Sequence, residues 1–304
     1  MEIDIFYNVP HFRPLGLPIA FYFYLTGLSA GSFVISVVSI LLGKVEYKAL
    51  SRISAVLAPL LLILAPTTLI YDLEQPMRFW FLFLYFNFYS PITYGSFLLT
   101  AYPIHSLIYA YFIFRGPART AKIMGALGIP LALATHGYTG FILALGKGRP
   151  LWSTALMPTM FIVSAMVSGI ALVILAAVIR HWLFMNGKPP EEIVKDKNLI
   201  IGLGKILGAT ILVDLFLIGN DIPVLLTSKQ EEYHVAQLIL FGDFAPLFIW
   251  VEIVIGSFIP LVLIFIPFTG RRLVFLSLAS VLVMIGIFAM RVVVVLAGQS
   301  IPLH

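Results

Sequence analysis

The chain has no cysteine among its 304 residues. It therefore has no thiolate with which to form a disulfide, hold an Fe–S cluster, attach a c-type haem or bind a metal ion. If such a group takes part in its function, we expect a partner protein to carry it.

Charged side chains are also scarce. Only 11% of the residues are charged and 61% are hydrophobic, with a mean hydropathy of +1.04, whereas soluble domains have about 25% charged and about 45–50% apolar residues. The net charge of +5 does not indicate nucleic-acid binding, because lysine and arginine are scattered between apolar runs and form no stripe. The composition predicts an integral membrane protein, and its partner is then the lipid bilayer. It excludes a separate soluble domain.

Long apolar runs extend along the whole chain. A helix that crosses a hydrocarbon core of about 30 Å needs about 20 apolar residues, far more than the roughly ten of a β-barrel strand. Acidic residues precede the first run, so it is not a cleavable signal peptide. We expect an all-α integral membrane protein with one transmembrane domain over 1–304. Its eight helices are predicted at 17–42, 53–72, 91–114, 123–146, 156–184, 199–220, 244–267 and 273–297.

Lysine and arginine are distributed unequally about these spans. One side has twelve of them and the other has five, while Lys205 and Arg291 fall inside spans. Because the more positive side of a membrane protein usually faces the cytoplasm, both termini are predicted outside. The loops 73–90, 147–155 and 221–243 then also lie at the outer face, with Asp221 among their acidic residues.

Three ionisable residues lie several positions from any span end: Asp214, Glu252 and Arg291. Each costs at least about 2.5–3.5 kcal/mol to insert at bilayer depth, so each needs a partner or a function. They either form a closed salt-bridge cluster or pass protons inward from one surface. Lys205 is close enough to the cytoplasmic end to extend its amine to the interface.

Two histidines, His105 and His136, lie near the middle of adjacent predicted spans. A haem b with two histidine ligands is one interpretation, although their distances from the span ends place them at different depths. A buried histidine with ordinary hydrogen bonds is another. His136 also opens the run His136-Gly137-Tyr138-Thr139-Gly140, in which hydrogen-bonding side chains and glycines suit a wall against which a flat ligand lies.

Several short motifs follow one another in the order seen in one known family. They are Pro18-Ile19-Ala20, Gly27-Leu28-Ser29-Ala30-Gly31, Asp72-Leu73-Glu74-Gln75-Pro76-Met77-Arg78-Phe79-Trp80, Asn87, Ser90-Pro91-Ile92-Thr93-Tyr94-Gly95, Gly137-Tyr138-Thr139-Gly140, Arg149-Pro150-Leu151-Trp152, Leu156-Met157-Pro158, Ser164-Ala165-Met166-Val167-Ser168-Gly169, Glu252 with Gly256 and Pro260, and Arg291 with Ala297-Gly298-Gln299. Through them the chain resembles the NrfD/PsrC family over nearly its entire length.

The resemblance implies a quinone- and quinol-binding anchor subunit of a respiratory oxidoreductase in the prokaryotic cytoplasmic membrane. Such a subunit exchanges electrons between a menaquinone-type pool and a ferredoxin-like Fe–S subunit on the outer face. That subunit serves a molybdopterin catalytic subunit of the polysulfide, sulfur or tetrathionate reductase type. The chain is then an enzyme only as part of the complex. It holds no metal or haem, because the bound quinone is itself the redox group. Proton transfer is compatible with this role.

The resemblance also implies site residues. Tyr138 lies against the quinone in the family pattern, with Asp72 and Asn87 on the outer loop motif and His136 beside them. Well-known polysulfide reductases have a histidine and an asparagine on the first helix where this chain has Ile19 and Tyr22, which leaves His11 or Tyr22 as the substitute. Asp214, Glu252 and Arg291 are the expected proton-transfer or stabilising chain.

Two other classes of protein remain open. A secondary transporter would also have kinked spans with buried charges, and it predicts an inverted repeat between the two halves of the chain; the sequence has no clear one. A haem b anchor subunit predicts histidine pairs at matched depths.

Overall fold

The computed structural model describes residues 15–43, 47–73, 75–185 and 187–300, and every regular element in these ranges is a helix. Eight helical spans are long and apolar enough to cross a membrane, as predicted. They are α1 (Leu17–Leu41), α2 (Lys48–Tyr71), α3 (Pro91–Arg115), α4 (Ala118–Ala144), α5 (Met157–Phe184), α6 (Pro190–Thr227), η3 (Pro246–Phe258) continued by α8 (Ile259–Phe265), and α10 (Leu273–Ala297).

The sixth span differs most from its predicted bounds of 199–220, because α6 has 38 residues. A proline at its first turn and the acidic pair Glu191 and Glu192 favour a helix start well before the apolar run, since proline fits the first turn and negative charge is favourable there. At about 1.5 Å per residue, α6 is much longer than the hydrocarbon core is thick. The second and fourth spans also begin about one turn earlier than predicted, at Lys48 and Ala118.

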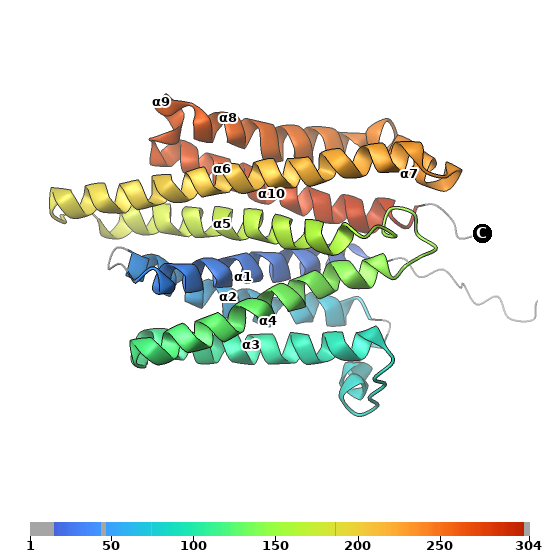
Figure 1. Ribbon diagram of the computed structural model, residues 1–304, viewed down its shortest axis with the longest axis horizontal. Coiled ribbons are helices and arrows are strands. Elements are labelled where there is room, and N and C mark those ends of the chain that lie inside the picture. Colours follow the sequence, from blue (N-terminus) through green and yellow to red (C-terminus); the bar gives the residue numbers. More distant parts are fainter. Residues whose placement is uncertain (1–14, 44–46, 74, 186, 301–304) are drawn as a thin grey trace, which may run out of the picture.

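Three short helices lie in segments that the sequence predicts as loops: η2 (Pro76–Phe83), α7 (Gln230–Leu240) and α9 (Pro267–Gly270). They are too short to span a bilayer. In Figure 1, η2, α7 and both ends of the described residues lie at one end of the bundle, here called the η2 end; α9 lies at the other, the α9 end.

The eight membrane-spanning segments form two groups of four. α1 to α4 make the first, and α5, α6, η3 with α8, and α10 make the second (Figure 1). The groups meet where α1 and α4 pack on α5, and where α1 packs on α10. The lysines and arginines predicted on the cytoplasmic side lie, where described, at the α9 end.

Serine hydroxyls hold the first group together. Oγ of Ser29 on α1 donates to the carbonyl of Ala58 on α2 at 2.8 Å. Further along α1, Oγ of Ser36 donates to the carbonyl of Ser51 at 2.7 Å and lies 2.9 Å from the hydroxyl of Tyr109 on α3. Such bonds join membrane helices at positions where small side chains allow close approach.

Residues of two sequence motifs, Arg149-Pro150-Leu151-Trp152 and Ala297-Gly298-Gln299, form hydrogen bonds at the η2 end. The side-chain amide of Gln299 donates to the carbonyl of Leu15 and accepts from its N–H, both at 2.7 Å. Nε1 of Trp152 donates to the carbonyl of Val294 at 2.7 Å, and Arg149 donates to the carbonyl of Gln299 at 3.1 Å. The α4–α5 loop, the end of α10 and the start of α1 are therefore fixed relative to one another.

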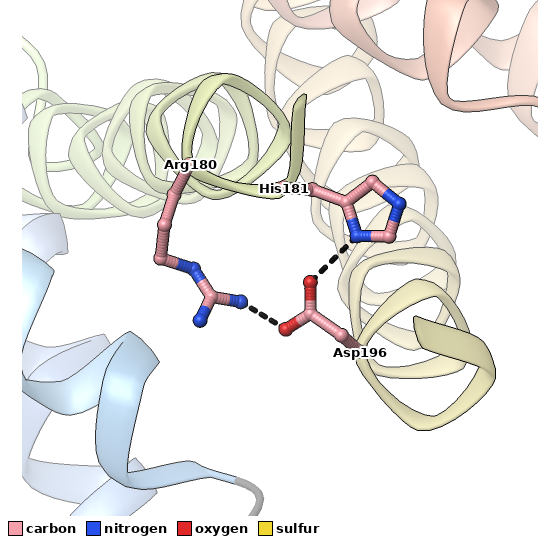
Figure 2. A network of polar contacts seen from close by, with 3 residues as sticks. All are labelled: Arg180, His181 and Asp196. Atoms are coloured by element: carbon pink, nitrogen blue, oxygen red, sulfur yellow. Dashed lines mark hydrogen bonds and ion pairs between the residues drawn. The ribbon is translucent and has the colours of Figure 1, made fainter. Parts of the chain in front are cut away.

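At the α9 end, three polar residues join α5 to α6, as Figure 2 shows. Asp196 on α6 accepts a hydrogen bond from Arg180 and one from Nδ1 of His181 at 2.7 Å, both residues lying on α5. All three side chains are largely buried.

The seventh span begins as a π-helix, η3, which no sequence pattern predicts. π-Helical turns are rare and often lie at functional sites. Here the segment includes the buried Glu252. Its Gly256 packs so closely on Gly286 of α10 that a Cβ on either glycine would overlap the backbone of the other.

Candidate functional site

A cavity of about 370 Å³ lies at the η2 end of the first helix group. Its walls are the first turns of α1 and α3, the last turns of α2 and α4, and η2. Most of the lining is apolar, and its polar side chains are Tyr22, Ser96, Thr100, Tyr138 and Thr139. The volume and the mostly apolar lining with a few polar groups are typical of small-ligand sites.

Two tyrosines from different helices, Tyr22 and Tyr138, line this cavity. The hydroxyl of Tyr138 on α4 donates to the carbonyl of Pro91 on α3 at 2.9 Å. Tyr22 on α1 is only 4% exposed, and its hydroxyl makes no hydrogen bond to any residue in the described ranges. A phenolic oxygen that already donates can still accept, whereas the unpartnered hydroxyl can do either.

The ring of Tyr138 is held by its neighbour on α3. A Cβ added to Gly95 would overlap the tyrosine ring and hydroxyl, so a side chain at position 95 would displace them. The motif Ser90-Pro91-Ile92-Thr93-Tyr94-Gly95 thus supplies both the carbonyl that Tyr138 binds and the space that its ring needs.

Other residues predicted for the same site lie outside the lining. Asp72 is near its edge, at the end of α2, where its carboxylate accepts from the N–H of Gly16 at 3.4 Å. Asn87 is exposed, and its side chain accepts from the N–H of Tyr89 at 3.0 Å. His11 lies outside the described residues. The cavity therefore brings together Tyr22 and Tyr138 from the predicted set.

His136 lies behind the cavity wall and is 1% exposed. Nη2 of Arg291 lies 3.2 Å from its Nε2. A guanidinium has no acceptor, so Nε2 accepts and the ring hydrogen is on Nδ1. That atom lies 3.3 Å from Oγ1 of Thr26, which in turn donates to the carbonyls of Tyr22 and Phe23 at 2.9 and 3.1 Å. A chain of hydrogen bonds therefore runs from Arg291 through His136 and Thr26 to the turn of α1 that carries Tyr22.

Arg291 is 1% exposed and lies where the two helix groups meet. Besides His136, its Nη2 donates to Oγ of Ser164 at 2.5 Å and to the carbonyl of Phe161 at 3.4 Å. The guanidinium carbon lies 3.9 Å from the centroid of the Phe161 ring. These contacts supply part of the solvation that water would give a cation, since an aromatic face attracts positive charge.

Asp214 and Glu252 are 3% and 4% exposed and interact electrostatically with Arg291. Nevertheless, in the described part of the chain neither carboxylate is within the 4.0 Å of Arg291 that defines an ion pair. Oδ1 of Asp214 and Oε2 of Glu252 have no hydrogen-bond partner there. The three residues are near one another without forming a closed cluster of ion pairs.

A second, smaller cavity of about 50 Å³ lies at the η2 end of the second helix group. Glu252 and Asp221 both line it, together with apolar side chains of α5, α6, α7, η3 and α10. A water molecule needs about 10–15 Å³ of such space, so several fit. The sequence predicts Asp221 at the outer face only as a surface residue, but it is 7% exposed and accepts from Thr154 at 3.4 Å.

The sequence contains little sign of Asp221 as a site residue, because its predicted place just after a span end is also typical of solvated acidic residues. The extension of α6 to Thr227 buries it.

His105, the other histidine considered for haem, lies with Nε2 2.8 Å from the carbonyl of Met124 on α4. The described ranges contain no group of three or more potential metal-ligating side chains.

Known proteins resemble this chain over most of its length. The family model described as polysulphide reductase, NrfD, matches residues 8–302. An Hdr-like menaquinol oxidoreductase integral membrane subunit of Archaeoglobus fulgidus is 29% identical over 280 residues, covering 92% of this chain and 69% of the relative. A selenate reductase subunit of Mesobacillus selenatarsenatis is 27% identical, covering 94% and 74%. A polysulfide reductase polypeptide of Wolinella succinogenes is 32% identical, covering 51% and 55%.

Proposed function

The chain belongs to the NrfD polysulphide reductase family, and we propose that it is the quinol-binding membrane subunit of a respiratory oxidoreductase complex. It is a multi-pass protein of the prokaryotic cytoplasmic membrane. In this proposal it takes electrons from, or returns them to, a menaquinone-type pool. The name of the Archaeoglobus relative, a menaquinol oxidoreductase subunit, supports that quinone class.

The observation that carries the proposal is the pairing of Tyr22 and Tyr138 on the 370 Å³ cavity. A quinone head group is flat and apolar, with oxygens at opposite ends that accept hydrogen bonds as quinone and donate them as quinol. The apolar lining favours the ring and the start of the isoprenoid tail. The two hydroxyls supply partners for the oxygens in both redox states, since a phenol donates and accepts.

The two tyrosines have different parts in the proposed chemistry. Because the hydrogen of Tyr138 is directed to Pro91, its oxygen is prepared to accept the hydrogen bond of a quinol hydroxyl. Tyr22 has no competing partner among the described residues and orients the same ring from α1. Asp72, at the edge of the cavity, is the proposed acceptor of the released proton toward the η2 end, with His11 and Asn87 as additional contacts from the N-terminal segment and outer loop.

The partners follow from what the chain lacks. Without cysteine, it has no ligands for the Fe–S cluster that would accept single electrons, so a ferredoxin-like subunit must approach the cavity. We place that subunit at the η2 end, as the outer face, and a molybdopterin catalytic subunit beyond it. The positive α9 end supports this orientation, because lysine and arginine are enriched on the cytoplasmic side.

The small cavity supports a proton route as a second part of the proposal. Water molecules between Asp221 and Glu252 would connect the η2 end to the unpartnered carboxylates beside Arg291. His136 and Thr26 continue the series to α1. In this scheme Asp214, Glu252 and Arg291 hold or move protons within the second helix group, and His136 and Thr26 link them to the turn of α1 that carries Tyr22.

The test is to purify the tagged full-length protein from its native membrane and assay the complex with menaquinol. We expect an Fe–S subunit to co-purify and menaquinol to reduce the complex's terminal acceptor. Removing the protein should abolish quinol-linked activity while leaving activity with an artificial electron donor. A preparation in which menaquinol neither binds nor donates electrons would contradict the proposal.

A further inference from the structure

One segment of the η2 end has an unusual composition. Eight of the fourteen residues at 76–89, here called the aromatic segment, are Phe, Tyr or Trp, and Arg78 is the only charged residue. Tyr85 is 76% exposed and Tyr89 is 98% exposed. A soluble loop with so much exposed aromatic surface would aggregate or bind a partner.

The position of the aromatic segment distinguishes the possible partners. In Figure 1 its helix η2 projects sideways from the end of α3, at the level of that helix's first turns, rather than beyond the end of the bundle. A protein docked on the outer face would cover the bundle end. A segment beside the bundle at this level is instead where the surface of a bilayer around the bundle would be.

The neighbouring surface of α3 is also apolar and exposed. The ring of Phe86 stacks on that of Phe97 with centroids 5.2 Å apart and planes 10° from parallel. Phe97 is 47% exposed and begins a stripe that continues along α3 through Ile104 and Leu107, at 53% and 49%. Because this stripe faces lipid in a membrane protein, the aromatic segment continues the lipid-facing surface to the interface.

The same segment borders the large cavity. Phe79, Leu82 and Phe83 of η2 are lining residues, and so are Ile92 and Thr100 on the exposed side of α3. The cavity wall on this side is therefore made of residues that also face outward. A molecule with a long hydrocarbon tail can occupy the cavity while its tail extends into lipid.

We infer that the aromatic segment lies in the plane of the outer membrane interface, as an in-plane anchor, and forms the lipid-side entrance of the cavity. Tyrosine and tryptophan are enriched at this depth because their rings are apolar and their hydroxyl or N–H groups are polar. With eight residues, η2 is far too short to span a hydrocarbon core that needs about 20. The entrance part of the inference rests on the proposed quinol site; the anchor part does not.

The absence of native cysteine allows a direct test by spin labelling. Leu84→Cys and Tyr85→Cys, labelled in the full-length protein in phosphatidylcholine nanodiscs, should collide more often with lipid-soluble O₂ than with a water-soluble nickel chelate. The matched controls are Leu107→Cys, which should report deep lipid, and Lys229→Cys, which should report water at the same end of the bundle. We expect the two segment labels to give a depth between these controls.

Two results would overturn the anchor: segment labels that behave like Lys229→Cys, or labels that lose contact with both reagents when the partner subunits are added. The second result would assign the surface to a protein partner.

The entrance is tested separately by Leu84→Asp, which adds a charge to the segment outside the cavity lining. We expect a several-fold lower kcat/KM for long-tailed menaquinol and an unchanged value for a short, water-soluble analogue. Val224→Asp, an equally exposed apolar position on α6, should change neither. If Leu84→Asp changes kcat/KM equally for both quinols, or for neither, the segment is not the entrance of the cavity. If the parent protein has no activity with any quinol, the proposed function itself is wrong.

Discussion

Replacing Tyr138 with phenylalanine removes one oxygen from the wall of the large cavity and keeps the ring. The hydroxyl makes one hydrogen bond, to the carbonyl of Pro91 at 2.9 Å, whose loss costs about 0.5–1.5 kcal/mol of stability. The ring stays in place, because the space provided by Gly95 is unchanged. Folding and assembly should therefore be nearly normal.

The expected effect on turnover is much larger. The hydroxyl holds the quinol in the position from which its proton is released, so Tyr138→Phe loses part of a proton-transfer contribution of roughly 10²–10⁴-fold, or about 2.7–5.4 kcal/mol of barrier at about 1.4 kcal/mol per factor of ten. Because this exceeds the cost of the lost Pro91 bond, the two roles of the hydroxyl can be separated by measurement.

The assay compares menaquinol oxidation by the assembled complex with its activity from an artificial donor that bypasses the membrane subunit. Tyr138→Phe should lower the first by roughly 10²-fold or more and leave the second and the subunit composition unchanged. Tyr22→Phe is the matched comparison on α1 and should mainly raise KM, because Tyr22 orients the ring. Parental quinol turnover in Tyr138→Phe would show that the hydroxyl only packs, and the site drawn around it would be wrong.

Three further outcomes are expected. Glu252→Gln should slow quinol turnover by roughly 10²-fold in an assembled complex that still binds quinone. Asp243→Asn, an exposed control at the same end of the bundle, should have no effect. If Glu252→Gln fails to assemble and Asp243→Asn does assemble, the role of Glu252 is purely structural. Arg291→Met should prevent assembly, because loss of one partner from a buried charge network costs about 3–5 kcal/mol, and a stable, active variant detected by size-exclusion chromatography would refute this. A reporter that is active only outside the cytoplasm should work when fused after His304, and activity of a cytoplasm-only reporter there would reverse the orientation.

The sequence was sufficient for the number of spans, because hydrophobic length is a local property that bilayer thickness makes almost decisive. It was insufficient where helices continue outside the apolar run. α6 extends to Thr227, which converts Asp221 from an expected surface residue into a buried one that lines the same cavity as Glu252. The π-helix of η3 is equally hidden, since its close contact with α10 depends on Gly256 and Gly286, which lie in different spans.

The large cavity was predictable in part. The run from His136 to Gly140 suggested a ligand wall, and the structure has Tyr138 and Thr139 on the cavity lining. His136, on another face of the same helix, bonds Arg291 instead, at a separation of 155 residues. Which face of a buried helix meets which neighbour depends on tertiary packing, and apolar spans with little amphipathic pattern do not encode it locally.

Occupation of the large cavity by a quinol is tested most directly by filling it. Ser96 is 8% exposed and lines the cavity, so Ser96→Leu places a bulky side chain where the ring would lie, whereas Ser277→Leu makes the same change on α10, away from the cavity. The measurement is equilibrium binding of a fluorescent quinone-site inhibitor to the intact complex. We expect Ser96→Leu to weaken binding at least about tenfold, or about 1.4 kcal/mol, and Ser277→Leu to bind as the parent does; unchanged affinity in Ser96→Leu would contradict a quinol site in this cavity.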